Sequence, residues 1–197
     1  MGSGYRPLDP SLYYVLVDDE VAIIKSQTGI EDDEELKRHI LAIQEEAYKL
    51  EPYPCIRRFG FAKWNISRHP CYQQFLKLGQ ERKGAIYADI GCCYLRHAHK
   101  FWDLGHKFFR STPKTFPARF ISADIFQLKD LAYEAVRTPP IDLSTVQLLS
   151  ELRGNISALH ASAFFHLFDE EGQFELAKIM ASLLSSAPGS MIFGISW

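Results

Sequence analysis

Four short apolar runs in the second half of the chain constrain its fold more than any other feature. They occupy residues 85–90, 119–123, 156–160 and 191–195, with the sequences AIYADI, RFISA, ISALH and MIFGI. Short, mostly apolar runs are typical of strands that are buried on both faces of a sheet. Because stretches of helical character separate them, we predict an α/β fold in which right-handed crossovers connect parallel strands.

Helical periodicity is clearest between residues 32 and 50. Four acidic residues, 32–35, suit the first turn of a helix, where the backbone dipole favours negative charge. One apolar stripe follows at spacings of three and four residues, and it consists of Leu36, Ile40, Ile43, Ala47 and Leu50. Pro52 and Pro54 then end the predicted helix.

Other segments carry weaker signals. We predict further helices at residues 70–78, 95–109, 144–154 and 174–184, the third from a capping-box pattern at 144–147. The apolar runs at 13–17 and 21–24 fit either short strands or packing segments. We therefore expect a helical N-terminal extension over residues 1–80 and an α/β core over residues 81–197. The extension is either a lid or the interface of a homodimer, and the sequence leaves both open.

Charge and composition exclude several classes of function. The 197 residues carry a net charge of −2 and no basic run, which argues against a nucleic-acid partner. No apolar run is long enough to span a bilayer, and the start lacks a secretory signal. We expect a cytoplasmic protein with reduced cysteines. Aromatic residues make up 13% of the chain, enough to fill a core and line an apolar pocket for a small molecule.

Ligands of open parallel sheets bind beyond the carboxyl ends of the strands, so the residues just after each run are the candidates. Asp89 lies at the end of the first run, and Gly91 and Cys92 follow it, where a glycine lets backbone amides approach a ligand closely. Cys93 is adjacent to Cys92, and we interpret this pair as ordinary buried thiols rather than metal ligands.

The second run is followed by Asp124 and Ile125, an acid and an aliphatic residue that would suit an adenine ring. The acid would accept a hydrogen bond from the exocyclic amine while the apolar side chain covers the ring. Asp124 equally fits the role of a cap for the following turn, and the sequence does not separate the two interpretations.

The third run ends in His160 and Ala161, and an aromatic cluster follows it. Phe164 and Phe165 would face an apolar substrate. His160 and His166 are the candidate general bases, although the apolar neighbours of His166 favour a packed structural histidine.

The order of these motifs resembles that of Rossmann-like methyltransferases that use S-adenosylmethionine. The closest similarity is to fungal O-methyltransferases of meroterpenoid and polyketide pathways, and it covers nearly the whole chain. The phrases that carry it are EPYPCIRRF, HPCYQQFLKLGQERKGAIYADIGCC, FWDLGHKFFRSTPKTFPARFISADIF and LRGNISALHASAFFHLFDE.

The resemblance implies methylation of an oxygen, either a carboxylate or a hydroxyl, with S-adenosyl-L-methionine as cofactor. It implies that Asp89, Gly91 and Cys92 line the methionine end of the cofactor and that Asp124 and Ile125 hold its adenine. His160 and Ala161 would close the pocket beneath the sulfonium.

The chain departs from that pattern in two places. The resemblance requires a second strand within residues 94–121, and this strand should end in an acid that binds the ribose. The sequence of this stretch instead predicts one helix and a loop. Strands after residue 195 are also expected and missing. We therefore expect an incomplete sheet, and the alternative function is a shortened or degenerate relative that does not transfer methyl groups. An NAD-dependent enzyme is a third alternative, and the lack of a GxGxxG fingerprint after the first strand argues against it.

Overall fold

The chain forms two compact units. The computed structural model describes residues 6–63, 66–91, 97–128 and 140–194. The helical unit comprises residues 6–63 and 97–118, and the sheet unit comprises the remaining described residues. Because the chain leaves the helical unit and later returns to it, the units do not divide at a single point. The predicted boundary after residue 80 stays a prediction.

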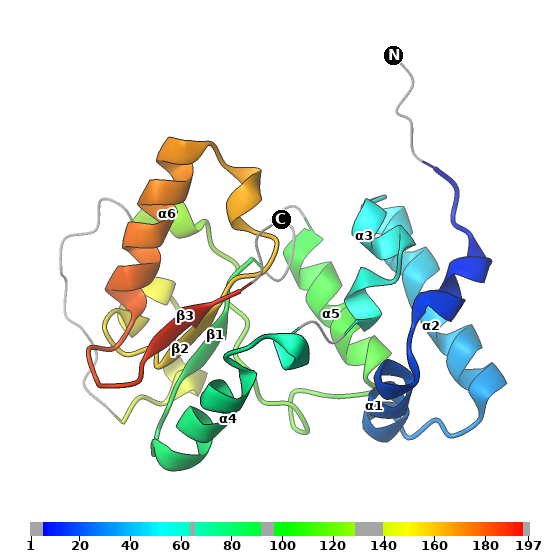
Figure 1. Cartoon of the computed structure of the whole chain (residues 1–197), viewed down its shortest axis with the longest axis horizontal. Helices are drawn as coiled ribbons and strands as arrows, with labels where there is room; N and C mark the ends of the chain where they lie inside the picture. Colours follow the sequence, from blue (N-terminus) through cyan, green and yellow to red (C-terminus); the bar gives the residue numbers. More distant parts are fainter. Residues whose placement is uncertain (1–5, 64–65, 92–96, 129–139, 195–197) are drawn as a thin grey trace. The chain divides into compact units, whose positions relative to one another are not determined.

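Helix α2, Asp33–Leu50, is the centre of the helical unit (Figure 1). Its cap is the one expected from the acidic run, since the Asp32 carboxylate accepts a hydrogen bond from the Glu35 backbone amide at 2.7 Å. The predicted stripe is confirmed at four of its five positions, which are buried: Leu36, Ile40, Ile43 and Ala47. The helix therefore buries the apolar face that its sequence specifies.

Short elements surround this helix. They are the 3₁₀ turn η1 (Pro10–Val15), α1 (Asp18–Thr28), α3 (Pro54–Arg57), η2 (Gly60–Ala62) and α5 (Ala98–Phe108). Of the two N-terminal runs that the sequence left open, 21–24 is helical and 13–17 is helical up to Val15, with buried Tyr13 in η1 and buried Ile24 in α1. Helix α5 packs on α2, where buried Leu104 and Phe108 join the same core.

A buried amide fixes α3 to α2. The Gln44 side chain is 1% exposed, and its Nε2 donates to the carbonyls of Ile56 at 3.1 Å and Arg57 at 3.0 Å. A buried amide is stable only when it has such partners. The polar position within the apolar stripe of α2 is therefore explained by the end of α3.

The sheet unit contains three parallel strands in the order β1 (Tyr87–Asp89), β2 (Ala158–His160) and β3 (Met191–Phe193). This confirms the predicted parallel α/β arrangement. Alternate residues face opposite sides of a strand. Ala88 and Leu159 face the core that includes helix α6 (Glu170–Leu183), whereas Phe193 contacts Phe75 of helix α4 (Tyr72–Glu81), with ring centroids 5.5 Å apart.

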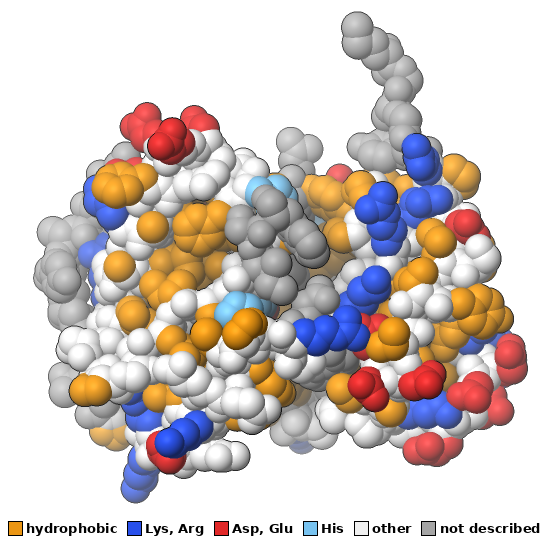
Figure 2. Space-filling view, viewed as in Figure 1, with side chains coloured by type: hydrophobic (Ala, Val, Ile, Leu, Met, Phe, Trp, Pro, Cys, Tyr) orange, Lys and Arg blue, Asp and Glu red, His pale blue; other side chains and the backbone are white. Residues whose placement is uncertain are grey.

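The start of α6 follows simple capping rules. Asp169 accepts a hydrogen bond from the Gly172 amide at 2.9 Å, and Glu170 and Glu171 occupy the first turn. Figure 2 shows acidic side chains gathered at this end of the helix. Negative charge there is favourable because the helix dipole places partial positive charge at its start.

Two sequence predictions are wrong. Residues 119–123 form no strand, although their composition favours one. A strand needs a neighbour for its backbone hydrogen bonds, and within the described residues β1 pairs only with β2. The Arg119 guanidinium instead donates to the Val146 carbonyl at 3.0 Å.

The helix predicted at 144–154 is also absent, and two short 3₁₀ turns replace it, η6 (Leu143–Thr145) and η7 (Leu149–Leu152). The Glu151 carboxylate accepts hydrogen bonds from the backbone amides of Gln147 and Leu148 at 2.8 and 2.7 Å. These bonds start a new turn at residue 149, so the segment does not continue as one helix. Three further 3₁₀ turns belong to the described part of the sheet unit: η3 (Ile66–Arg68), η5 (Ile125–Leu128) and η8 (Phe165–Leu167).

Among the described residues, no helix is both long enough and apolar enough to cross a bilayer.

We expect Gln44→Met to destabilise the protein by about 1–3 kcal/mol, because two buried carbonyls lose their donor while the side-chain volume is kept. Urea unfolding followed by circular dichroism measures this change. Gln73→Met is the control, since Gln73 is an exposed position of α4. Equal effects of the two substitutions would contradict the role assigned to Gln44.

Candidate functional site

The register of the sheet brings candidate residues from two distant segments together. Asp89 pairs with His160, and His160 pairs with Phe193, so the three residues end adjacent strands. Their side chains lie on one face, the face that Phe75 covers. Asp89 and His160 are thus adjacent for the reason that the sequence suggested, because the carboxyl ends of parallel strands share one edge.

Asp89, His160 and Ser162 form a hydrogen-bonded chain. Asp89 Oδ1 lies 2.8 Å from His160 Nδ1, and His160 Nε2 lies 2.8 Å from Ser162 Oγ. A carboxylate can only accept, so Nδ1 carries the hydrogen and Nε2 of the neutral ring accepts from the Ser162 hydroxyl. The ring packs on Phe193 with centroids 5.2 Å apart, which further fixes its orientation.

Exposure differs along this chain. The His160 side chain is 13% exposed, whereas that of Asp89 is 43% exposed. The carboxylate can therefore be approached from outside the protein, while the imidazole is held between its partners. This arrangement presents an anionic group at the strand edge with an oriented base behind it.

Gly91 has a left-handed backbone, with φ of +77°, and the Phe164 ring packs directly on it. A Cβ added at Gly91 would lie 2.5 Å from Phe164 Cδ2. Glycine is therefore required at position 91 for two reasons: the left-handed backbone disfavours a Cβ, and the Phe164 ring leaves no space for one. The sequence predicted a close approach to this glycine, and the group that makes the approach is a side chain of the protein itself.

Strained backbone positions Phe164. Ala163 has φ of +51°, a left-handed conformation that is uncommon for a residue with a Cβ. The Phe164 ring contacts the Phe168 ring edge-to-face, with centroids 5.3 Å apart, and the Phe168 ring contacts that of Phe126, with centroids 5.0 Å apart. Phe165 is half-buried against the core of the sheet unit. Packing thus holds this turn in a conformation that its residues do not favour by themselves.

Asp124 acts as a cap. Its Oδ1 accepts a hydrogen bond from the Phe126 amide at 3.0 Å, at the start of η5. Ile125 is 7% exposed and belongs to the core of the sheet unit. The capping interpretation of Asp124 is therefore observed, and its role toward an adenine stays a prediction.

The remaining candidate site residues are Ala161, His166 and Cys92. Ala161 is buried, and its amide donates to the Phe193 carbonyl at 3.0 Å. His166 is exposed, so the packed structural role expected from its apolar neighbours is wrong. Its place in η8, where the backbone turns, directs it away from the core. Cys92, with Cys93, lies outside the described residues.

Sequence reasoning missed Ser162 and Phe193. Ser162 stands two residues after His160, and this spacing was the only signal for its hydrogen bond. Phe193 could be placed beside His160 only with the register of β3, which the sequence does not specify.

The chain is similar to fungal methyltransferases. Residues 9–62 match the family described as the meroterpenoid methyltransferase N-terminal domain. The asnovolin E/chermesin D methyltransferase of Aspergillus novofumigatus is 30% identical over 81% of this chain and 58% of its own length. The O-methyltransferase phiE of a fungal species is 29% identical over 79% of this chain and 52% of its own length.

The methyltransferase ausD of Penicillium brasilianum is 27% identical over 93% of this chain and 68% of its own length. The chain thus spans about half to two thirds of the length of the curated relatives it matches. No solved structure matches it significantly. These findings confirm the resemblance to fungal methyltransferases of secondary metabolism that the sequence motifs indicate.

We expect Gly91→Ala to destabilise the protein by more than about 1–2 kcal/mol, the usual cost of a left-handed backbone with a Cβ, because the new methyl group also meets Phe164. Gly84→Ala is the matched control, since Gly84 has φ of +73° and open space around it. In a Phe164→Ala background, Gly91→Ala should cost only as much as Gly84→Ala. A double-mutant cycle of urea unfolding measures this, and simple additivity would contradict the contact.

Proposed function

We propose that this chain binds S-adenosyl-L-methionine at the strand ends of the sheet unit and methylates an oxygen of an apolar meroterpenoid or polyketide intermediate. The observation that carries the proposal is the similarity to fungal methyltransferases, joined to the meeting of Asp89, Gly91 and His160 at one sheet edge. The bound cofactor would supply an electrophilic methyl group on a sulfonium.

The residues at the strand ends fit the cofactor in part. Asp89 offers a half-exposed carboxylate, which suits the ammonium of the methionine portion. As the resemblance implies, Gly91 would line the methionine portion, and Asp124 with Ile125 would hold the adenine. The Phe164 ring covers the side of Gly91 where a Cβ would lie, so a ligand on that side would have to displace the ring.

The chain's own contribution to methyl transfer would be mainly alignment. Holding two reactants in line contributes roughly 7–11 kcal/mol. A carboxylate acceptor is already a nucleophile and needs no base. A hydroxyl acceptor must lose a proton, and His160 Nε2 can receive it, either directly or through Ser162, because Asp89 holds the other nitrogen protonated. Phe164 and Phe165 would contact the apolar acceptor.

A second candidate is a relative that no longer transfers methyl groups. Two observations favour it, the Phe164 ring on Gly91 and, within the described residues, the lack of a strand beside the outer edge of β1. The resemblance places the ribose-binding acid on such a strand. Losing that acid removes charge-assisted hydrogen bonds worth about 1.5–3 kcal/mol each.

Calorimetry with S-adenosylhomocysteine separates the two candidates. We expect saturable binding to the full chain and an affinity about tenfold or more lower for Asp89→Asn, since a charge-assisted hydrogen bond becomes a neutral one. Asparagine can still accept from His160 Nδ1, so the histidine keeps its partner. Asp103→Asn, at an exposed position of α5, is the control. No binding at millimolar ligand by folded wild-type protein and by Phe164→Ala would support the non-methylating relative.

The acceptor group determines the effect of His160→Gln. With a hydroxyl acceptor, we expect transfer of labelled methyl groups to fall by about 10²–10⁴, the usual contribution of a general base. With a carboxylate acceptor, transfer should change little. Extracts of a fungal meroterpenoid producer, separated into phenolic and acidic fractions, provide the acceptors. A large loss with both fractions would contradict the assignment of His160 as the base.

A further inference from the structure

The helical unit contains a pocket that the strand-end residues do not form. It has a volume of about 530 Å³, within the range of small-molecule sites. Helix α5 and the chain that follows it supply most of the lining, including Trp102, His106, Phe109 and Phe116, and Gln27 of α1 completes it. Every lining residue belongs to the helical unit, so the pocket is a property of that unit alone.

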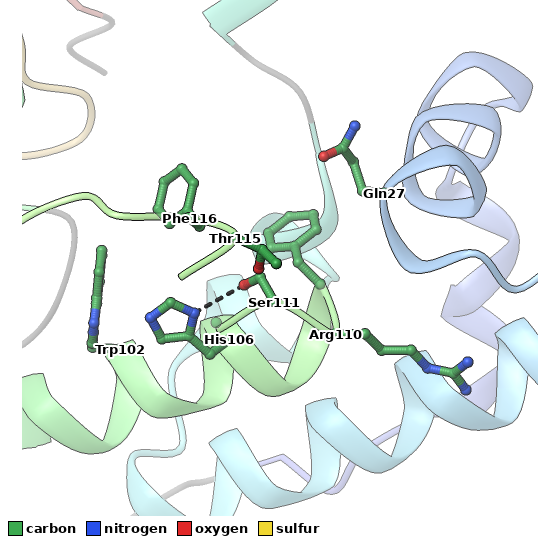
Figure 3. A pocket seen from close by; sticks show the side chains of 9 residues that line it. Gln27, Trp102, His106, Arg110, Ser111, Thr115 and Phe116 are labelled. Atoms are coloured by element: carbon green, nitrogen blue, oxygen red, sulfur yellow. Dashed lines mark hydrogen bonds between the residues drawn. The ribbon is translucent and has the colours of Figure 1, made fainter. Parts of the chain in front are cut away.

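Three rings define the apolar part of this pocket. The ring centroids of Trp102 and His106 are 5.2 Å apart, and the two ring planes are nearly perpendicular. The ring centroid of Phe116 lies 6.1 Å from that of Trp102 and 6.3 Å from that of His106. Figure 3 shows the three side chains arranged around one space. Phe116 is 51% exposed, so much of its apolar surface is open to solvent. The rings therefore present flat, apolar surfaces that a planar ligand could cover.

The polar groups of the pocket are uncharged or already paired. His106 Nδ1 is 2.9 Å from Ser111 Oγ, which leaves Nε2 as the hydrogen-bonding atom of that ring toward a ligand. The Arg110 guanidinium forms an ion pair with Glu35 at 2.9 Å, and its side chain points away from the rings (Figure 3). The pocket thus suits a ligand without charge that carries one oxygen able to pair with an imidazole.

Gly105 keeps the pocket open. It lies inside helix α5 and lines the pocket, and a Cβ added there would meet no atom within 4 Å. Glycine inside a helix is less stable than alanine, and here neither a close neighbour nor a left-handed backbone requires it. The helix therefore loses stability at a position that lines the pocket and where a side chain would take up its space.

We propose that this pocket of the helical unit is a binding site for an uncharged, ring-containing small molecule with a carbonyl or hydroxyl oxygen. Its rings pack on Trp102 and Phe116, and its oxygen pairs with His106. The site stands on the pocket geometry and on Gly105, and it is independent of whether the sheet unit transfers methyl groups.

The test is a fluorescence titration of the full chain with prodan, an uncharged naphthyl ketone whose emission brightens and shifts to the blue when it leaves water. We expect saturable binding to the wild-type protein. Gly105→Leu should weaken it by about tenfold or more, because the new side chain occupies the space of the ring contacts. Thermal unfolding should show that this variant is at least as stable as the wild type, since leucine favours the helix.

Gly79→Leu is the matched control. Gly79 also lies inside a helix, α4, with no atom within 4 Å of an added Cβ, and it does not line the pocket. The Gly79→Leu variant should bind prodan as tightly as the wild type. Phe116→Ala should weaken binding, whereas Phe174→Ala, which removes another exposed phenylalanine, should not. Absence of saturable binding, unchanged binding by Gly105→Leu, or equal losses in both leucine variants would overturn the proposal.

Discussion

The hydrogen bond between Asp89 and His160 depends on the register of the sheet, and the candidate site depends on that bond. A shift of one residue would move every side chain of a strand to the opposite face. In the observed register both residues occupy the last pair of β1 and β2, and Phe193 occupies the matching place in β3. The bond also fixes the protonated nitrogen of the imidazole, and with it the direction of the contact to Ser162.

Local signals in the sequence were sufficient for much of the fold. The stripe and cap of α2 are short-range features, and the apolar runs around β1, β2 and β3 identify those strands. The same kind of signal failed at residues 119–123, because a strand also needs a partner from elsewhere in the chain. It failed again at 144–154. There the Glu151 carboxylate accepts hydrogen bonds from two backbone amides, and a separate turn begins.

The candidate site was predictable in position and only partly in detail. That Asp89 and His160 would meet follows from the rule for parallel strands, whereas the placement of Phe164 on Gly91 follows from the left-handed conformation of Ala163, which no sequence rule gives. Asp124 shows the opposite limit, because a capping role and a binding role use the same residue type. The hydrogen bond from Phe126 shows the capping role, and the binding role stays a prediction.

The distance along the chain between the partners of the site has a consequence for folding kinetics. Asp89 and His160 are separated by 71 residues, and the strand that carries Phe193 follows still later. Contacts between remote segments form slowly, because closing the long loop costs conformational entropy before the contact can stabilise the fold. Helix α2, whose cap and backbone hydrogen bonds are local, can form early, whereas the imidazole is aligned only once remote strands have paired.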